Sequence, residues 1–111
     1  MSIKTIKKRY DFSLSHKLGK KKYGKYLNIQ LLNRRDNTEE VLFGFTITKK
    51  IGISVIRNKI RRRLKSIIMS LNKDNENYFN IGYNYVFVGK PSIINASFKE
   101  LKEEIIISCK K

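Results

Sequence analysis

The chain has 111 residues and carries 25 Lys and Arg against 9 Asp and Glu, a formal net charge of +16. This length favours one domain, residues 1–111, and the 41% of apolar residues can supply its core. No uncharged apolar run of transmembrane length and no signal-peptide pattern is present, and one cysteine with one histidine excludes disulfide and zinc frameworks. We therefore expect a small cytoplasmic domain whose partner is a polyanion, namely RNA, DNA or an anionic membrane.

The first half of the chain predicts a short helix followed by strands. Residues 9–18 favour the helix, and the charged residues 20–25 predict a loop or the start of a strand. Residues 26–32 and 41–48 alternate apolar and polar side chains, as strands do, and the polar stretch between them predicts an antiparallel pair. A third short strand is expected at residues 49–53.

The second half predicts two helices around a buried strand. Residues 54–72 predict a long helix with Ser54 as its N-cap. Its apolar residues fall in one sector about 120° wide: Ile56, Ile60, Leu64, Ile67, Ile68 and Leu71. Residues 84–89 predict the buried strand, and residues 97–109 a closing helix that Ser97 and Glu100 begin as a capping box. The residues expected on the inner face of this last helix are Phe98, Leu101, Ile105 and Cys109.

These elements follow the order α-β-β-(β)-α-β-α. Burying their apolar faces predicts an α+β two-layer sandwich, in which helices cover one face of a small mixed β-sheet of about four strands. The other face of the sheet would stay partly open, which suits a polar ligand. The side chains expected to point outward from this face are Asn28, Gln30, Thr46 and Thr48.

The long helix also carries a cationic face. Opposite its apolar sector lie Asn58, Arg61, Arg62 and Lys65, while Arg57 and Arg63 flank the sector. Lys and Arg neutralise phosphates, and Asn can bond a phosphate, a 2′-hydroxyl or a base edge. Because residues 49–65 contain eight basic residues and no acidic one to pair with them, this face indicates nucleic-acid binding.

The segment 43–65, FGFTITKKIGISVIRNKIRRRLK, resembles the signature of the bacterial ribonuclease P protein subunit, whose helix carries an Arg-Asn-Arg type motif. The resemblance extends along nearly the whole chain. It implies an α+β sandwich with a left-handed crossover between parallel strands, against the usual rule. It also implies that an RNA subunit with bound Mg²⁺ hydrolyses the phosphodiester at the 5′ end of precursor tRNA. The protein would be the accessory subunit.

By position, the resemblance assigns residues to two RNA-binding surfaces. The surface for the catalytic RNA comprises Lys49, Lys50, Arg57, Asn58, Lys59, Arg61, Arg62 and Lys65. The cleft for the 5′ leader, between the sheet and the first helix, comprises Phe12, His16, Asn28 and Gln30. His16 stands where a second cleft aromatic is usual, and Ile53 where the family commonly has Asn. Judged by its residue type alone, Phe12 fits a core position as well as a cleft.

The partners implied are the catalytic RNA and precursor tRNA, with no membrane and no obligate protein partner, and with Mg²⁺ held by the RNA and substrate. A ribosomal-type structural RNA-binding protein is the alternative, and partner choice distinguishes the two. The absence of a helix-turn-helix pair argues against DNA binding. A membrane-surface helix is disfavoured because the core needs the apolar sector of residues 54–72. A protein nuclease is disfavoured because no carboxylates cluster as metal ligands.

Overall fold

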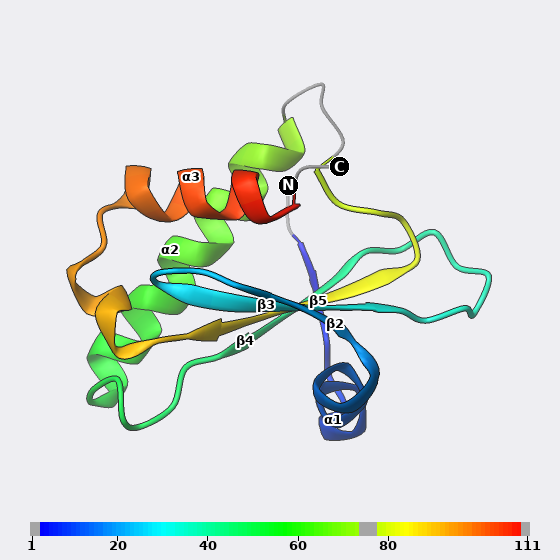
Figure 1. Cartoon of the computed structure of the whole chain (residues 1–111), viewed down its shortest axis with the longest axis horizontal. Helices are drawn as coiled ribbons and strands as arrows, with labels where there is room; N and C mark the ends of the chain where they lie inside the picture. Colours follow the sequence, from blue (N-terminus) through cyan, green and yellow to red (C-terminus); the bar gives the residue numbers. More distant parts are fainter. Residues whose placement is uncertain (1–2, 74–77, 110–111) are drawn as a thin grey trace.

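The computed structural model describes residues 3–73 and 78–109, which form one mixed sheet with helices on both of its faces (Figure 1). The elements in chain order are β1 (Lys4–Thr5), α1 (Arg9–Leu18), β2 (Lys20–Tyr23), β3 (Leu27–Asn33), β4 (Leu42–Thr46), α2 (Ser54–Lys73), β5 (Tyr83–Gly89), the 3-10 helix η1 (Pro91–Asn95) and α3 (Phe98–Cys109). The predicted α+β class is confirmed. The described sheet has five strands because β1 and β2 join it, whereas residues 49–53 form a turn in which Ile51 N–H donates to the Thr48 carbonyl.

Strand β5 lies at the centre of the sheet, in the order β1-β4-β5-β3-β2. It pairs antiparallel with β3 and parallel with β4, so the predicted direct pairing of residues 26–32 with residues 41–48 is wrong. The physical reason is the composition of β5. Its residues Tyr85, Val86 and Phe87 are buried on both faces of the sheet, and a strand of this kind needs a neighbour on each side.

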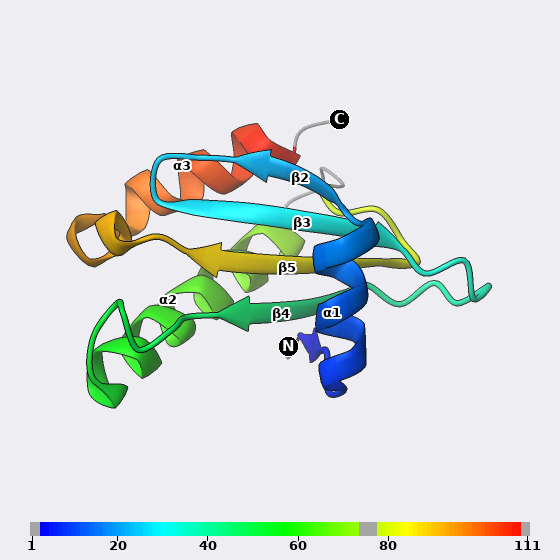
Figure 2. The same ribbon diagram turned by 60° about the horizontal axis from the view of Figure 1, so that its bottom comes forward.

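The connection from β4 through α2 to β5 is a crossover between parallel neighbours. Figure 2 views the sheet from the α1 side, with α2 behind it and both strands running in the same direction. In Figure 2, β4 and β5 both point to the left, and β5 lies above β4. Seen instead from the α2 side with the strands pointing up, β5 therefore lies to the left of β4. The crossover is therefore left-handed, as the resemblance implies and against the usual preference.

Helices α2 and α3 cover one face of the sheet, whereas α1 crosses the opposite face (Figures 1 and 2). The expectation that all helices lie on one face is therefore wrong for α1. The reason is the site on which α1 packs: Gly44 of β4 has no side chain, and the ring of Phe12 occupies the space above it. A sheet position without a side chain leaves room for a short helix to pack closely on this face.

The core between the sheet and α2 contains the predicted apolar sector. Ile60, Leu64, Ile67, Ile68 and Leu71 are all buried. Ile56 does not follow the prediction, because 37% of it is exposed. It lies in the first turn of α2, where its side chain packs against Gly52 instead of the sheet.

The ends of the two long helices differ from each other. At the start of α3, Ser97 N–H donates to the Glu100 carboxylate and Glu100 N–H donates to Ser97 Oγ, both at 3.1 Å, which confirms the predicted capping box. In α2 the first helical bond runs from Arg57 N–H to the Ile53 carbonyl, so the prediction of Ser54 as N-cap is wrong.

The inner face of α3 follows the predicted spacing at three of its four positions. Leu101, Ile105 and Cys109 are buried, while Phe98, the first residue of the helix, is 43% exposed. A half-buried residue of this helix, Glu104, positions the sheet edge. The carboxylate of Glu104 accepts the N–H groups of Tyr26 and Leu27, at 3.1 and 3.0 Å, and so holds the turn between β2 and β3.

Candidate nucleic-acid interface

The face of the sheet that α1 crosses presents two rows of side chains running across four strands. Alternation along each strand and the pairing register place these residues on the same face. One row is Tyr23, Asn28, Val88 and Thr46, and the other is Lys21, Gln30, Val86 and Gly44. The predicted outward direction of Asn28, Gln30 and Thr46 is therefore correct, whereas Thr48 lies beyond the end of β4.

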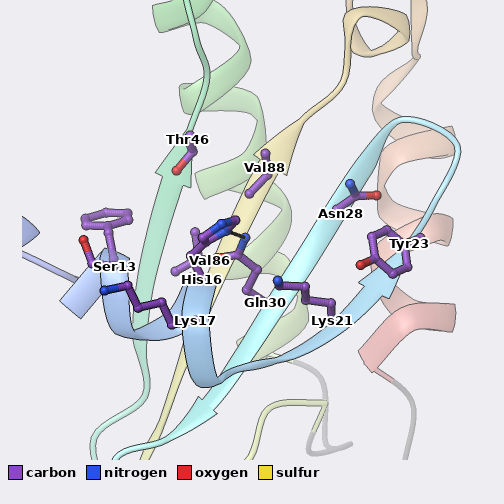
Figure 3. Close-up of a pocket in the computed structure, with 11 residues that line it drawn as sticks. Ser13, His16, Lys17, Lys21, Tyr23, Asn28, Gln30, Thr46, Val86 and Val88 are labelled. Carbon is purple, nitrogen blue, oxygen red and sulfur yellow. Dashed lines mark hydrogen bonds between the residues drawn. The ribbon is translucent and has the colours of Figure 1, made fainter. Parts of the chain in front are cut away.

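Helix α1 lies over these rows and closes a cleft of about 570 Å³ (Figure 3). From the helix, the cleft is lined by Phe12, Ser13, His16 and Lys17, which share one helical face at spacings of one and four residues. The structure thus brings together all four residues of the leader cleft that the resemblance implies, namely Phe12, His16, Asn28 and Gln30.

Phe12 is half-buried and belongs both to the packing of α1 and to the wall of the cleft. A Cβ atom added at Gly44 would lie 2.5 Å from Cε1 and 2.7 Å from Cζ of the Phe12 ring. The ring therefore rests directly on the backbone of β4. This resolves the choice between core and cleft, since one edge of the ring packs on the sheet while the residue lines the open space.

His16 and Gln30 connect α1 to β3 across the cleft. Gln30 is buried, and its Nε2 atom lies 3.4 Å from Nδ1 of His16, which is exposed. An amide nitrogen only donates, so Nδ1 is the acceptor in this contact. The imidazole of His16 thus provides a flat polar group in the cleft (Figure 3), which Phe12 also lines.

The cleft is electropositive. Lys17 and Lys21 line it, and no Asp or Glu does. Across residues 3–73 and 78–109 the ion pairs are Lys4 with Glu40 and Arg34 with Asp36, and neither involves a cleft residue. The positive charge of the cleft is therefore available to an external anion.

The predicted basic surface lies on α2, which covers the face of the sheet opposite to α1, and on the turn before α2, beyond the end of β4 (Figure 1). Within it, two guanidinium groups are oriented by oxygen atoms of the protein. Arg57 Nε donates to the Gly52 carbonyl at 3.1 Å, and Arg61 donates to Asn58 Oδ1 at 3.0 Å. The remaining members are exposed: Lys49, Lys50, Lys59, Arg62 and Lys65.

The structure therefore separates the predicted residues into two sites rather than joining them into one. The α2 surface presents cations along one helix and the turn before it, while the cleft presents a ring, an imidazole and two amides around a hollow. Cations neutralise phosphates of any nucleic acid, whereas rings and amides interact with unstacked bases. The two surfaces thus suit different RNA structures.

Several cleft residues were not identified from the sequence as members of the site. They are Ser13, Lys17, Lys21, Tyr23, Val86 and Val88. Helical spacing from Phe12 and His16 would have indicated Ser13 and Lys17. Lys21 and Tyr23 required recognition of β2 as a strand, and its sequence KKKY has no apolar alternation.

Cys109 is not part of either surface. Burial raises the pKa of its thiol to about 12, so the group stays protonated and packs as a small apolar side chain. Within the described ranges, no three His, Cys, Asp or Glu residues converge as metal ligands. None of the helices in those ranges is long and apolar enough to cross a membrane.

Comparison with known proteins gives one consistent result. The Ribonuclease P family model matches residues 2–111. The ribonuclease P protein component of Alkaliphilus oremlandii is 34% identical over 110 residues, which cover 99% of this chain and 91% of the relative. That of Clostridioides difficile is 34% identical over 102 residues, which cover 92% and 85%.

Solved structures show the same fold. The RNase P protein of Staphylococcus aureus superposes with a TM-score of 0.81 at 18% identity, covering 96% of this chain and 92% of that one. The RNase P protein of Thermotoga maritima gives a TM-score of 0.81 at 20% identity and covers 96% of each chain. The α+β arrangement described above is therefore shared along almost the entire length of the chain.

Proposed function

Because the chain belongs to the ribonuclease P protein family, whose members are the protein component of ribonuclease P, we propose that its two basic surfaces bind two different RNAs. The cleft between α1 and the sheet binds the single-stranded 5′ leader of precursor tRNA. The α2 surface binds the catalytic RNA. The observation that supports this division most directly is the acid-free cleft, which combines the Phe12 ring with the amides of Asn28 and Gln30.

The cleft matches the chemistry of an unpaired strand. Stacking of a base on an aromatic ring contributes about 1–3 kcal/mol and tolerates any base, because every base has a π-face. The Asn28 amide can bond base edges, while Lys17 and Lys21 can neutralise phosphates. A base-paired duplex presents no free base faces to such a site, so the cleft selects a leader over the mature acceptor stem.

The α2 surface matches a folded RNA backbone. Its exposed cations follow one face of a helix, with Arg57 and Arg61 held in place by the Gly52 carbonyl and the Asn58 side chain. Fixed guanidinium groups present forked donors that suit phosphate oxygens. Because α2 covers the face of the sheet opposite to α1 (Figure 1), one molecule of the protein can hold both RNAs at once.

In this proposal the catalytic RNA, and not the protein, carries out the hydrolysis of precursor tRNA. The described residues offer no cluster of metal-ligating side chains, so Mg²⁺ would be held by the catalytic RNA and the substrate. The protein contributes positive charge that reduces repulsion between the two polyanions, and it contributes affinity for the leader. This activity needs no second protein, and we place it in the cytoplasm, where bacterial precursor tRNA is made.

The test is reconstitution with a bacterial ribonuclease P RNA at low Mg²⁺, using tRNA with and without a 5′ leader. The protein should enable cleavage, and it should tighten binding only when the leader is present. Phe12→Ala should remove a large part of that tightening, about 5-fold to 150-fold, since it deletes the stacking ring. The matched control is Tyr10→Ala, which removes a 68% exposed ring from the same helix outside the cleft.

Two results would contradict the proposal. If Phe12→Ala and Tyr10→Ala behave alike, the cleft does not hold the leader. If the wild-type protein binds both RNAs equally and leaves cleavage unchanged, the leader has no part in recognition. A preference for ribosomal RNA in the same assay would instead support a ribosomal-type structural role.

A further inference from the structure

A second cleft, of about 650 Å³, lies at the edge of the sheet where β2 begins and α3 ends. Its lining includes Lys20 and Lys22 of β2, Arg35 of the following loop, and Tyr83 at the start of β5. Side chains alternate along a strand, so Lys20 and Lys22 point to the opposite side of β2 from Lys21, which lines the leader cleft. The second cleft therefore extends the positive charge of the leader cleft around the edge of the sheet.

The second cleft resembles the leader cleft in its charge. Neither is lined by an acidic residue. Two further clefts in the described parts of the chain differ in this respect, because Glu100, Glu103 and Glu104 line one of them, and Asp11 and Glu40 line the other. The cations of the second cleft take part in neither of the ion pairs found within residues 3–73 and 78–109. An anion entering this cleft would meet uncompensated positive charge.

Aromatic and amide groups accompany the cations. Tyr83 is half-buried, and its ring lies 6.2 Å from that of Tyr85, which supports it from the core side. Asn80 lines the same cleft. Arg35 adopts a left-handed backbone conformation with φ of 55°, and Asn33 Oδ1 accepts its N–H at 3.0 Å. Lysine, arginine, tyrosine and an amide are together the composition of a single-strand-binding site rather than of a simple anion site.

The position of β2 connects the two clefts. It is an edge strand, so no further strand of the described sheet lies outside it. The Cα atoms of its consecutive residues Lys20, Lys21 and Lys22 are only about 3.8 Å apart. Lys21 nevertheless lines the leader cleft, whereas Lys20 and Lys22 line the second cleft. A strand of RNA that leaves the leader cleft over this edge passes from Lys21 directly to Lys20 and Lys22.

From this arrangement we propose that the second cleft binds the distal nucleotides of the same single-stranded leader, those farthest from the cleavage site, after the strand has crossed β2. This inference rests on the proposed function of the first cleft and extends it. A short leader would fill only the cleft beside α1. A longer leader would also occupy the second cleft, with a base on Tyr83 and phosphates on Lys20 and Arg35.

The experiment compares precursor tRNAs with short and long leaders bound to the reconstituted ribonucleoprotein. The test variant is the double substitution Lys20→Gln with Arg35→Gln. Removing two phosphate contacts to a single strand should reduce the slope of log K against log salt by about 1.4, or 0.7 for each contact. We expect this reduction, and a matching loss of affinity, only with the long leader.

Two other variants control for charge and folding. Arg9→Gln with Lys99→Gln removes the same charges from exposed positions outside both basic clefts, and it should leave the salt slope unchanged for both leaders. Lys20→Arg with Arg35→Lys keeps the charge of the cleft and should retain the wild-type slope. Circular dichroism melting curves would establish that each variant is folded.

Other outcomes overturn the inference. An equal loss with short and long leaders would mean that the catalytic RNA, not the leader, occupies the second cleft. No change in the test variant would mean that the cleft binds no RNA in the complex. In both cases Phe12→Ala still reports on the first cleft by itself, so the failure of this inference is distinguishable from failure of the proposed function.

Discussion

Replacing Gly44 with alanine tests the contact on which the leader cleft depends. The added Cβ would lie 2.5 Å from Cε1 of Phe12 and 3.1 Å from Cδ1 of Ile6. Carbon atoms in contact prefer a separation of about 3.5–4.0 Å, so the Phe12 ring must move by roughly 1 Å or α1 must shift with it. Overpacking of this kind costs about 1–3 kcal/mol.

The lower flexibility of alanine in the unfolded chain opposes this cost and reduces the net change in the free energy of unfolding. The backbone of Gly44 is not in the left-handed region, so alanine is unstrained there and should recover roughly 0.5–1 kcal/mol relative to glycine in a strand. In the wild-type background, Gly44→Ala should therefore lower the free energy of unfolding by about 0–2 kcal/mol. In the Phe12→Ala background the clash with the ring is gone and only the 3.1 Å approach to Ile6 remains, so the same substitution should raise the free energy of unfolding by at most about 0.5–1 kcal/mol.

The assay is a double-mutant cycle. Urea titration of the wild type, both single variants and the double variant gives the coupling free energy, for which we expect about 1–3 kcal/mol. Gly44→Ala should also weaken binding of leader-bearing precursor, because the added methyl group displaces the Phe12 ring from its position on β4. Tyr10→Ala replaces Phe12→Ala in a control cycle, which should be additive within about 0.5 kcal/mol. If Gly44→Ala costs the same with and without the Phe12 ring, the packing argument is wrong.

Three further predictions concern the rest of the molecule. Arg62→Gln with Lys65→Gln should weaken binding to the catalytic RNA and reduce its salt slope by roughly 1.4–1.8, while the effect of the leader persists. The Tyr26 hydroxyl, which donates to Glu100 at 2.6 Å, holds the pKa of that carboxyl below its usual value. The ionised Glu100 carboxylate therefore stabilises the fold at neutral pH, and this stabilisation is lost as the pH falls through the lowered pKa. In Glu100→Gln the melting temperature should consequently fall less steeply as the pH is lowered. Cys109, with its pKa raised to about 12, should react with an alkylating reagent at pH 8 only after urea unfolds the protein.

The first two of these have a matched control variant, and the third has a result that would contradict it. Lys99→Gln with Lys102→Gln removes two charges from α3 and should leave the salt slope for catalytic RNA unchanged. Glu103→Gln neutralises an exposed carboxylate near Glu100 and should leave the fall of the melting temperature at low pH as in the wild type. Rapid alkylation of Cys109 in the folded protein would show that the end of α3 opens, which would contradict its burial.

The local features of this protein follow from its sequence. The span of α1 agrees with the prediction at both ends, the capping box of α3 forms as expected, and the cationic face of α2 lies opposite its buried sector. These features depend on residues within about four positions of each other, where helical spacing and capping chemistry act directly. The net charge likewise indicates a polyanionic partner without any structure.

The order of the strands and the shape of the cleft required the tertiary structure. Alternation in β3 shows which side chains share a face, but it is equally compatible with either neighbour, so the insertion of β5 between β3 and β4 was not predictable from it. The placement of α1 depends on a glycine that is thirty-two positions away from Phe12 in sequence and in direct contact with its ring. The sequence by itself therefore determined the α-helices α1, α2 and α3 and the charge, and it indicated a polyanionic ligand. The fold decided where these groups meet, because contacts between distant segments depend on the packing of the whole chain.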